Sequence, residues 1–136
     1  MRVEDLVHLK YRLTKSQQAL SEAECLLGEG FGTGVVNRIY YALFYSASAL
    51  LLLEGNASSK HSGVLSLFNR LWIKPGRLPR EMGAFYVAMF DRRQKGDYWD
   101  LAEFDRADLE SWLNEARAFV GQVHAWFRDN EGLTLD

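Results

Sequence analysis

The segment Arg92-Arg93-Gln94-Lys95-Gly96-Asp97-Tyr98 contains the side chains best suited to bind or act on an anion. Three of its residues are cations, and arginine forks recognise phosphate groups bidentately. Arg93 and Asp97 are four residues apart, so they can pair across one helical turn, and Tyr98 adds a hydroxyl and a ring that can stack. The segment therefore predicts a site for a phosphodiester or a nucleotide. The alternative is that the cations only complement the dipole of a helix C-terminus.

Two other polar pairs, Asn37-Arg38 and Lys60-His61, lie next to apolar stretches. A charge at Arg38, near the start of an apolar helix, must reach solvent or find an acidic partner. Either Arg38 extends from the end of the bundle to water, or it lies in a polar cleft. His61 is expected at the N-terminal edge of a further helix. There it belongs either to an exposed capping loop or, if it faces the arginines of the first segment, to an anion site.

Other kinds of catalytic site are not supported by the sequence. The three histidines, His8, His61 and His124, are far apart, and neither a zinc motif nor the Glu-x-x-His pairs of di-iron bundles occurs. The four glycines between residues 28 and 34 match no phosphate-binding loop, and a nucleophile elbow is absent. We therefore expect no metal and no cofactor. The single cysteine, Cys25, lies in an apolar stretch, so we expect it to pack in the core.

Helical periodicity places these residues on five expected helices. Apolar residues recur every three or four positions, and glycines, prolines and polar loops separate the periodic stretches. The expected helices span about residues 3–28, 35–54, 62–72, 80–95 and 105–128. The second is apolar over most of its circumference, which is typical of a helix at the centre of a bundle or in a dimer interface. The sequence thus predicts an all-α, up-and-down bundle of four to five helices.

Finer features of these helices are also expected from residue types. Gly28 is placed to end the first helix, and Asp105 or a neighbour is placed to cap the last one. The fourth helix is expected to bury Val87 together with its other apolar residues. Gly96 is expected to loosen the chain after that helix.

The composition is that of a folded globular domain, and the lone cysteine implies no oxidising compartment, so we expect the protein in the cytoplasm. Apolar residues make up 48% and charged residues 25% of the chain, as in ordinary globular proteins. We expect one domain over residues 1–136, with a disordered tail after about residue 129. The net charge of −2 argues against a general nucleic-acid binder, but residues 60–95 carry eight Lys/Arg and two acids, which gives this segment +6. The apolar run 39–53 is shorter than a bilayer needs, so no membrane span is expected.

Four stretches of the chain share motifs, in order and in rough spacing, with a known family. They are Asn37-Arg38-Ile39-Tyr40-Tyr41-Ala42-Leu43-Phe44, Ala49-Leu50-Leu51-Leu52, Lys60-His61-Ser62-Gly63-Val64 and Arg92-Arg93-Gln94-Lys95-Gly96-Asp97-Tyr98. Through them the chain resembles the HEPN domain proteins (higher eukaryotes and prokaryotes nucleotide-binding), and specifically their small stand-alone prokaryotic branch. The resemblance covers about residues 5–125.

The resemblance implies a bundle of four to five helices that often forms a homodimer through its central helices. It also implies a minimal nucleotidyltransferase as partner, with the two proteins often acting as a toxin–antitoxin module. Many members of the family are metal-independent ribonucleases in which a His follows an Arg after about four to six residues, near the fourth helix. The His would be the general base toward a ribose 2′-hydroxyl, and the Arg would stabilise the phosphate.

This sequence departs from that motif, because no His follows Arg92 or Arg93 at the required spacing. Asp97 and Tyr98 stand there instead, and a guanidinium beside Asp97 favours its charged form, which weakens it as a base. The prediction is therefore a nucleotide- or RNA-binding HEPN-like protein, the partner of a minimal nucleotidyltransferase. One alternative is a metal-independent endoribonuclease that uses Arg93 with His61 or Asp97. The other is a non-catalytic helical dimerisation module.

The expected site combines all of these clusters. The family's modified tyrosine lies just after its Arg–His pair, so the resemblance makes Tyr98 the candidate for nucleotidylation. The residues expected to bind a nucleotide or another anion are Asn37, Arg38, Lys60, His61, Arg92, Arg93, Asp97 and Tyr98.

Overall fold

The computed structural model describes residues 3–98 and 103–134, and for Asp97 and Tyr98 it describes the backbone only. These two ranges form five α-helices and one short π-helix, and they contain no strand. The elements are α1 (Val3–Glu29), α2 (Gly32–Leu53), α3 (His61–Phe68), η1 (Asn69–Ile73), α4 (Arg80–Tyr98) and α5 (Arg106–Glu131). The expected all-α helical bundle is therefore confirmed.

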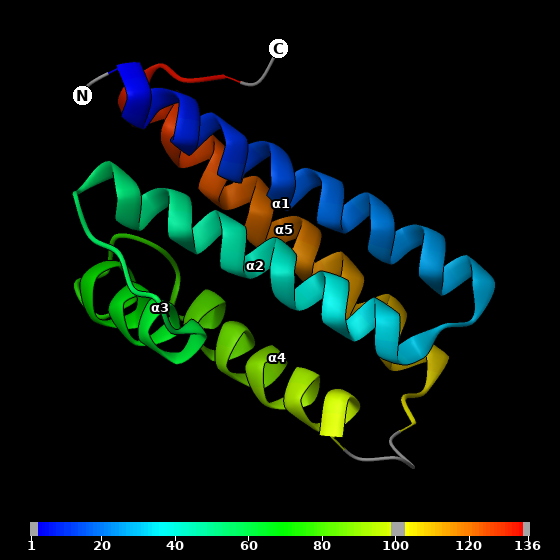
Figure 1. The fold of residues 1–136 in the computed structure, drawn as a ribbon. Coiled ribbons are helices and arrows are strands. Elements are labelled where there is room, and N and C mark those ends of the chain that lie inside the picture. The colour runs from blue at the N-terminus through cyan, green and yellow to red at the C-terminus, as the bar shows by residue number, and fades with distance from the viewer. Residues whose placement is uncertain (1–2, 99–102, 135–136) are drawn as a thin grey trace.

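The bundle is built around α2 (Figure 1). The helices α1, α3, α4 and α5 each pack against it. In Figure 1 the long helices α1, α2 and α5 lie side by side, and α3 and α4 lie on the side of α2 away from α1. Full burial of one large apolar side chain contributes about 1.5–3 kcal/mol, so α2 supplies much of the stability of the core. Its buried residues are Val35, Val36, Ile39, Tyr40, Ala42, Leu43, Ser46, Ala47, Ala49, Leu50 and Leu51.

By length and composition α2 could also cross a membrane. The helix begins at Gly32, before the apolar run 39–53, and this added length makes it long enough to span a bilayer. However, 61% of its most apolar window is buried inside the protein. Packing against the four other helices therefore accounts for the apolar character of α2.

The connection between α1 and α2 consists of Gly30 and Phe31 alone. The N–H of Gly30 donates to Leu27 O at 3.2 Å, and the N–H of Phe31 donates to Leu26 O at 2.9 Å. This is the Schellman pattern, which requires a left-handed residue after the helix, and Gly30 has a φ of 81°. Gly30, not the expected Gly28, therefore ends α1.

The buried face of α4 differs from the one expected. Met82, Phe85, Tyr86 and Met89 are buried, whereas Val87 is 43% exposed. Buried positions at intervals of three and four residues lie on one side of a helix, and position 87 falls outside that stripe. The helix also continues through Gly96 to Tyr98, so Gly96 does not loosen the chain as expected.

The last helix is longer than predicted, and the cysteine is not in the core. Asp105 stands at the N-cap position of α5, but its side chain makes no capping hydrogen bond. Gly132, with a φ of 62°, ends the helix after Glu131, and the N–H of Leu133 donates to Phe127 O at 3.2 Å. The chain thus keeps a defined structure past residue 129. Cys25 is exposed on α1, so the expectation that it packs in the core is wrong.

Candidate functional site

His61, the first residue of α3, lies against the aromatic face of α2. The Tyr40 hydroxyl and His61 Nδ1 are 2.8 Å apart and share a hydrogen bond. The imidazole also stacks on the Phe44 ring, with centroids 4.5 Å apart and planes at 13°. Lys60 holds the N-cap position in an extended conformation, which directs His61 from the preceding loop into the helix. The imidazole is therefore oriented by contacts with two α2 side chains.

Arg93 approaches the same aromatic face from α4. Its guanidinium carbon is 4.9 Å from the Tyr40 ring centroid and 5.3 Å from the Tyr41 ring centroid. Its Nη2 donates to the Tyr41 hydroxyl over a long 3.5 Å. A cation over an aromatic face is attracted by the ring quadrupole. The bundle thus brings Arg93 and His61, which lie far apart in the sequence, to the same pair of tyrosines.

Arg38 reaches Tyr41 as well, and it is held in place by two oxygen acceptors. Its guanidinium carbon is 4.7 Å from the Tyr41 centroid. Its Nε and Nη2 donate to Asn37 Oδ1 at 3.1 and 2.8 Å, and its Nη1 pairs with Glu22 Oε1 of α1 at 3.2 Å. Arg38 thus has the acidic partner that a charge at this position needs, while its side chain stays 29% exposed. The acidic partner is Glu22, which the sequence reasoning did not name.

The expected site residues do not all meet at this place. Arg92 points to α5, where its guanidinium carbon is 4.1 Å from the Trp112 ring centroid, and its Nη1 is 3.4 Å from Met89 Sδ. Lys60 is exposed at the edge of the cluster. The side chains of Asp97 and Tyr98 lie outside the described part of the chain, so the expected pair between Arg93 and Asp97 stays a prediction.

The aromatic residues of α2 in this region were expected only as part of its apolar surface, not as site residues. Tyr40, Tyr41 and Phe44 follow Asn37 at intervals of three, four and seven residues, so all four side chains share one face of the helix. This spacing was the available signal. We refer to Arg38, Tyr40, Tyr41, His61 and Arg93 as the aromatic–cation cluster.

Burial and the neighbouring cation set the protonation states in this cluster. Burial raises the pKa of Tyr40 well above its ordinary value, although the Arg93 cation acts in the opposite direction and Tyr41 raises it further. Burial also lowers the pKa of His61, and the Arg93 cation lowers it again. Near neutral pH Tyr40 therefore keeps its proton while His61 stays neutral. A neutral imidazole can accept a proton at Nε2 when its Nδ1–H donates to the Tyr40 oxygen.

The described residues provide no arrangement for a metal ion. Among residues 3–98 and 103–134 there is no group of three or more His, Cys, Asp or Glu side chains that could hold one. His124 is engaged elsewhere, with its Nε2 3.2 Å from Ser16 Oγ and its Nδ1 3.4 Å from Gln17 Nε2. The groups that Arg38, Arg93, Tyr40, Tyr41 and His61 themselves offer are guanidinium, hydroxyl and imidazole groups.

Comparison with known proteins identifies the family. The family model of the HEPN domain matches residues 9–126, which is most of the chain. A UPF0332 protein of Thermotoga maritima is 41% identical over 121 residues, which cover 89% of this chain and 92% of that protein. A Methanocaldococcus jannaschii protein named "Putative toxin" is 30% identical over 124 residues, which cover 87% of this chain and 84% of that protein. The chain belongs to the HEPN family.

Replacing Arg93 with Gln is expected to raise the pKa of His61, because the change removes a cation that disfavours a second positive charge nearby. Burial is the larger cause and persists, so the pKa should remain below its ordinary value. NMR titration of the His61 imidazole measures the shift. Arg92→Gln is the matched control, since Arg92 lies against Trp112. An equal shift in both variants, or none in Arg93→Gln, would contradict the assignment.

Proposed function

We propose that this HEPN protein binds single-stranded RNA or a nucleotide through the aromatic–cation cluster, as the toxin-like half of a two-protein module. The observation that carries the proposal is the pair of guanidinium groups, from Arg38 and Arg93, over the Tyr41 ring. Guanidinium groups recognise phosphates, and aromatic side chains stack on unpaired bases. Two relatives from Methanocaldococcus jannaschii are named "Putative toxin", which supports the toxin-like assignment.

The members of the cluster contribute differently to such binding. Tyr40 is fully buried, so it can act only by positioning its neighbours. Tyr41 and His61 are partly exposed and present ring surface to a base. The Arg38 side chain is 29% exposed and keeps one edge toward Glu22, which holds the guanidinium in place while leaving part of it for a phosphate.

Arg38→Gln is expected to weaken binding of a fluorescently labelled single-stranded RNA by about ten- to a hundredfold, because a charge-assisted hydrogen bond contributes about 1.5–3 kcal/mol. Fluorescence anisotropy at two salt concentrations measures the affinity and its salt dependence. Arg117→Gln is the control, because Arg117 is an exposed cation that pairs with Glu24 away from the cluster. Equal losses in the two variants, or no loss in Arg38→Gln, would count against the proposal.

A second candidate function, metal-independent endoribonuclease activity, is favoured by the hydrogen bond between Tyr40 and His61 beside Arg93. In this reaction His61 Nε2 takes the proton of a ribose 2′-hydroxyl, and O2′ attacks the adjacent phosphorus. The bond from phosphorus to O5′ breaks, and O5′ leaves with a proton from water. Arg93 stabilises the negative charge that builds up on the phosphate oxygens. Asp97 is the alternative base.

If this activity exists, RNA cleavage in the presence of EDTA should fall by about a hundredfold or more in His61→Ala, because loss of a general base costs about 10²–10⁴ in rate. Tyr40→Phe removes the hydrogen bond between the Tyr40 hydroxyl and His61 Nδ1, so it should shift the pH profile of cleavage. His124→Ala is the control, as that imidazole is bonded to Ser16 and Gln17. Cleavage that persists unchanged in His61→Ala would refute the role of His61 and leave Asp97→Asn to be tested.

The partner in the proposed module is a minimal nucleotidyltransferase, and Tyr98 is its modification site. The protein would act in the cytoplasm as a homodimer. Most of α2 is buried within the chain, so a second copy would meet only its partly exposed side chains, such as Tyr45. A helical dimerisation module that binds no RNA is the competing proposal, and sedimentation combined with RNA titration separates the two.

Where a minimal nucleotidyltransferase is encoded beside this chain, co-expression with it should add the mass of one or more nucleotide units to the peptide that contains Tyr98. Tandem mass spectrometry locates the modification. It should be absent in Tyr98→Phe and retained in Tyr11→Phe, where the replaced tyrosine is an exposed residue of α1. A modification that survives in Tyr98→Phe would show that another residue is modified. If the two proteins neither bind each other nor give a modified peptide, the partnership is excluded.

A further inference from the structure

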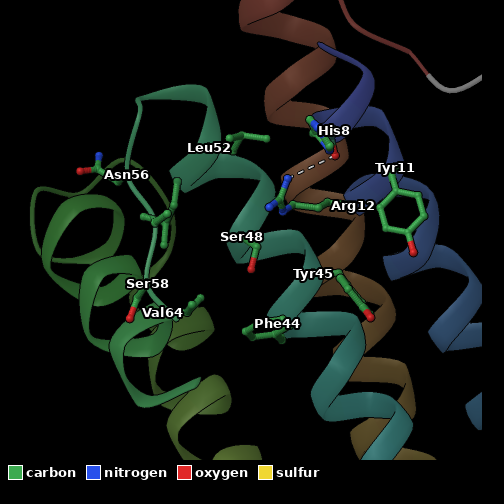
Figure 2. Close-up of a pocket in the computed structure, with 12 residues that line it drawn as sticks. His8, Tyr11, Arg12, Phe44, Tyr45, Ser48, Leu52, Asn56, Ser58 and Val64 are labelled. Atoms are coloured by element: carbon green, nitrogen blue, oxygen red, sulfur yellow. Dashed lines mark hydrogen bonds between the residues drawn. The ribbon is translucent and has the colours of Figure 1, made fainter. Parts of the chain in front are cut away.

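A cavity of about 280 Å³ lies between α1, the C-terminal half of α2 and the loop that leads into α3. Figure 2 shows Arg12 reaching from α1 toward α2 beside Ser48, with Ser58 and Val64 on the other side. Arg38, Tyr41 and Arg93 do not line it. The cavity is therefore separate from the aromatic–cation cluster, although it shares the Phe44 ring with the surroundings of His61.

The cavity carries the positive charge of Arg12. Its lining includes His8 and Arg12 and no acidic residue. The Arg12 side chain donates one long hydrogen bond, from Nη1 to His8 O at 3.4 Å, and no acid among the described residues forms an ion pair with it. A guanidinium carries five N–H donors. Arg12 therefore has several donors that can meet an anion inside the cavity.

The rest of the lining is apolar, with a few hydroxyl groups. Phe44, Leu52 and Val64 supply apolar walls, and Ser48 and Ser58 supply hydroxyls. Small-molecule sites in proteins combine mostly apolar walls with a few placed polar groups, over about 300–1,000 Å³. A cavity near the lower end of that range suits a one-ring compound rather than a polymer.

We propose that this cavity binds a small organic anion that carries one phosphate or carboxylate group on a compact apolar body. Arg12 holds the anionic group, and the apolar body lies between Phe44 and Val64. The two anionic groups share the same recognition chemistry, because a guanidinium fork fits both.

Two residues that line the cavity also help to position His61. Phe44 lines the cavity and stacks on the imidazole. Ser58 also lines it, and its Oγ accepts the N–H of Lys60, the residue before His61, at 3.2 Å. Ser58 packs so closely on Gly63 that a Cβ at that position would overlap its side chain. A ligand that touches Phe44 and Ser58 therefore contacts the residues that fix the start of α3.

The test is an NMR titration of the full-length ¹⁵N-labelled chain with phenyl phosphate, benzoate, benzyl alcohol and inorganic phosphate. Saturable shifts of amides in residues 8–12, 44–52 and 56–58 are expected with phenyl phosphate or benzoate. Benzyl alcohol and inorganic phosphate should each bind at least about tenfold more weakly, because the first lacks the anionic group and the second lacks the apolar body. Comparison of the affinities for phenyl phosphate and benzoate shows which anionic group the cavity prefers.

Variants locate the binding and keep it distinct from the proposed RNA site. Arg12→Gln should weaken phenyl phosphate or benzoate at least about tenfold, and Lys10→Gln, an exposed cation of the same helix that does not line the cavity, should not. Ser48→Leu should abolish binding by filling the cavity, whereas Arg93→Gln should leave it unchanged. Shifts that do not saturate, that fall outside the named segments, or that persist in Ser48→Leu would overturn the proposal.

Discussion

Burial of α2 on most of its circumference is the constraint on which the rest of this structure depends. Four helices cover it, and Tyr40 is enclosed completely. A buried hydroxyl must find a hydrogen-bonding partner, because leaving it unpaired costs about 1–3 kcal/mol. His61 supplies that partner from the start of α3. This hydrogen bond, together with the burial of Val64 and Phe68 of α3, holds the imidazole against α2.

The same burial sets the chemistry of the aromatic–cation cluster. Arg93 is attracted to the faces of Tyr40 and Tyr41, and its charge combines with burial to keep His61 neutral. Arg93, a cation that can bind a phosphate, thus lies beside His61, a neutral imidazole that can accept a proton. Ordinarily a carboxylate next to a histidine would favour the charged imidazole. Among the described side chains, Glu22 is the acid that contacts the cluster, and it pairs with Arg38 and not with His61.

The helices could be predicted from the sequence because apolar periodicity and turn residues are local signals. All five expected α-helices exist, and the errors lie at their ends and in one register. Glycines at 32 and 34 were expected between helices, yet they lie inside α2. At Gly34 a Cβ would be only 3.0 Å from Leu26 Cδ1, so this residue permits close helix packing. Such a packing contact cannot be distinguished from a turn in the sequence, and the exposure of Val87 likewise depends on which side of α4 meets α2.

The sequence by itself determined the helical class, the polar pairs that interrupt apolar stretches, and the absence of a His after Arg93 at the family's spacing. It could not determine which of those groups meet. Arg92 and Arg93 are neighbours in the chain, but the helical rotation of about 100° per residue sends one to Trp112 on α5 and the other to the tyrosines of α2. Only the tertiary structure decided that His61 lies near Arg93. Their proximity arises because α3 and α4 both pack on the aromatic face of α2, and spacing along the chain does not encode such packing.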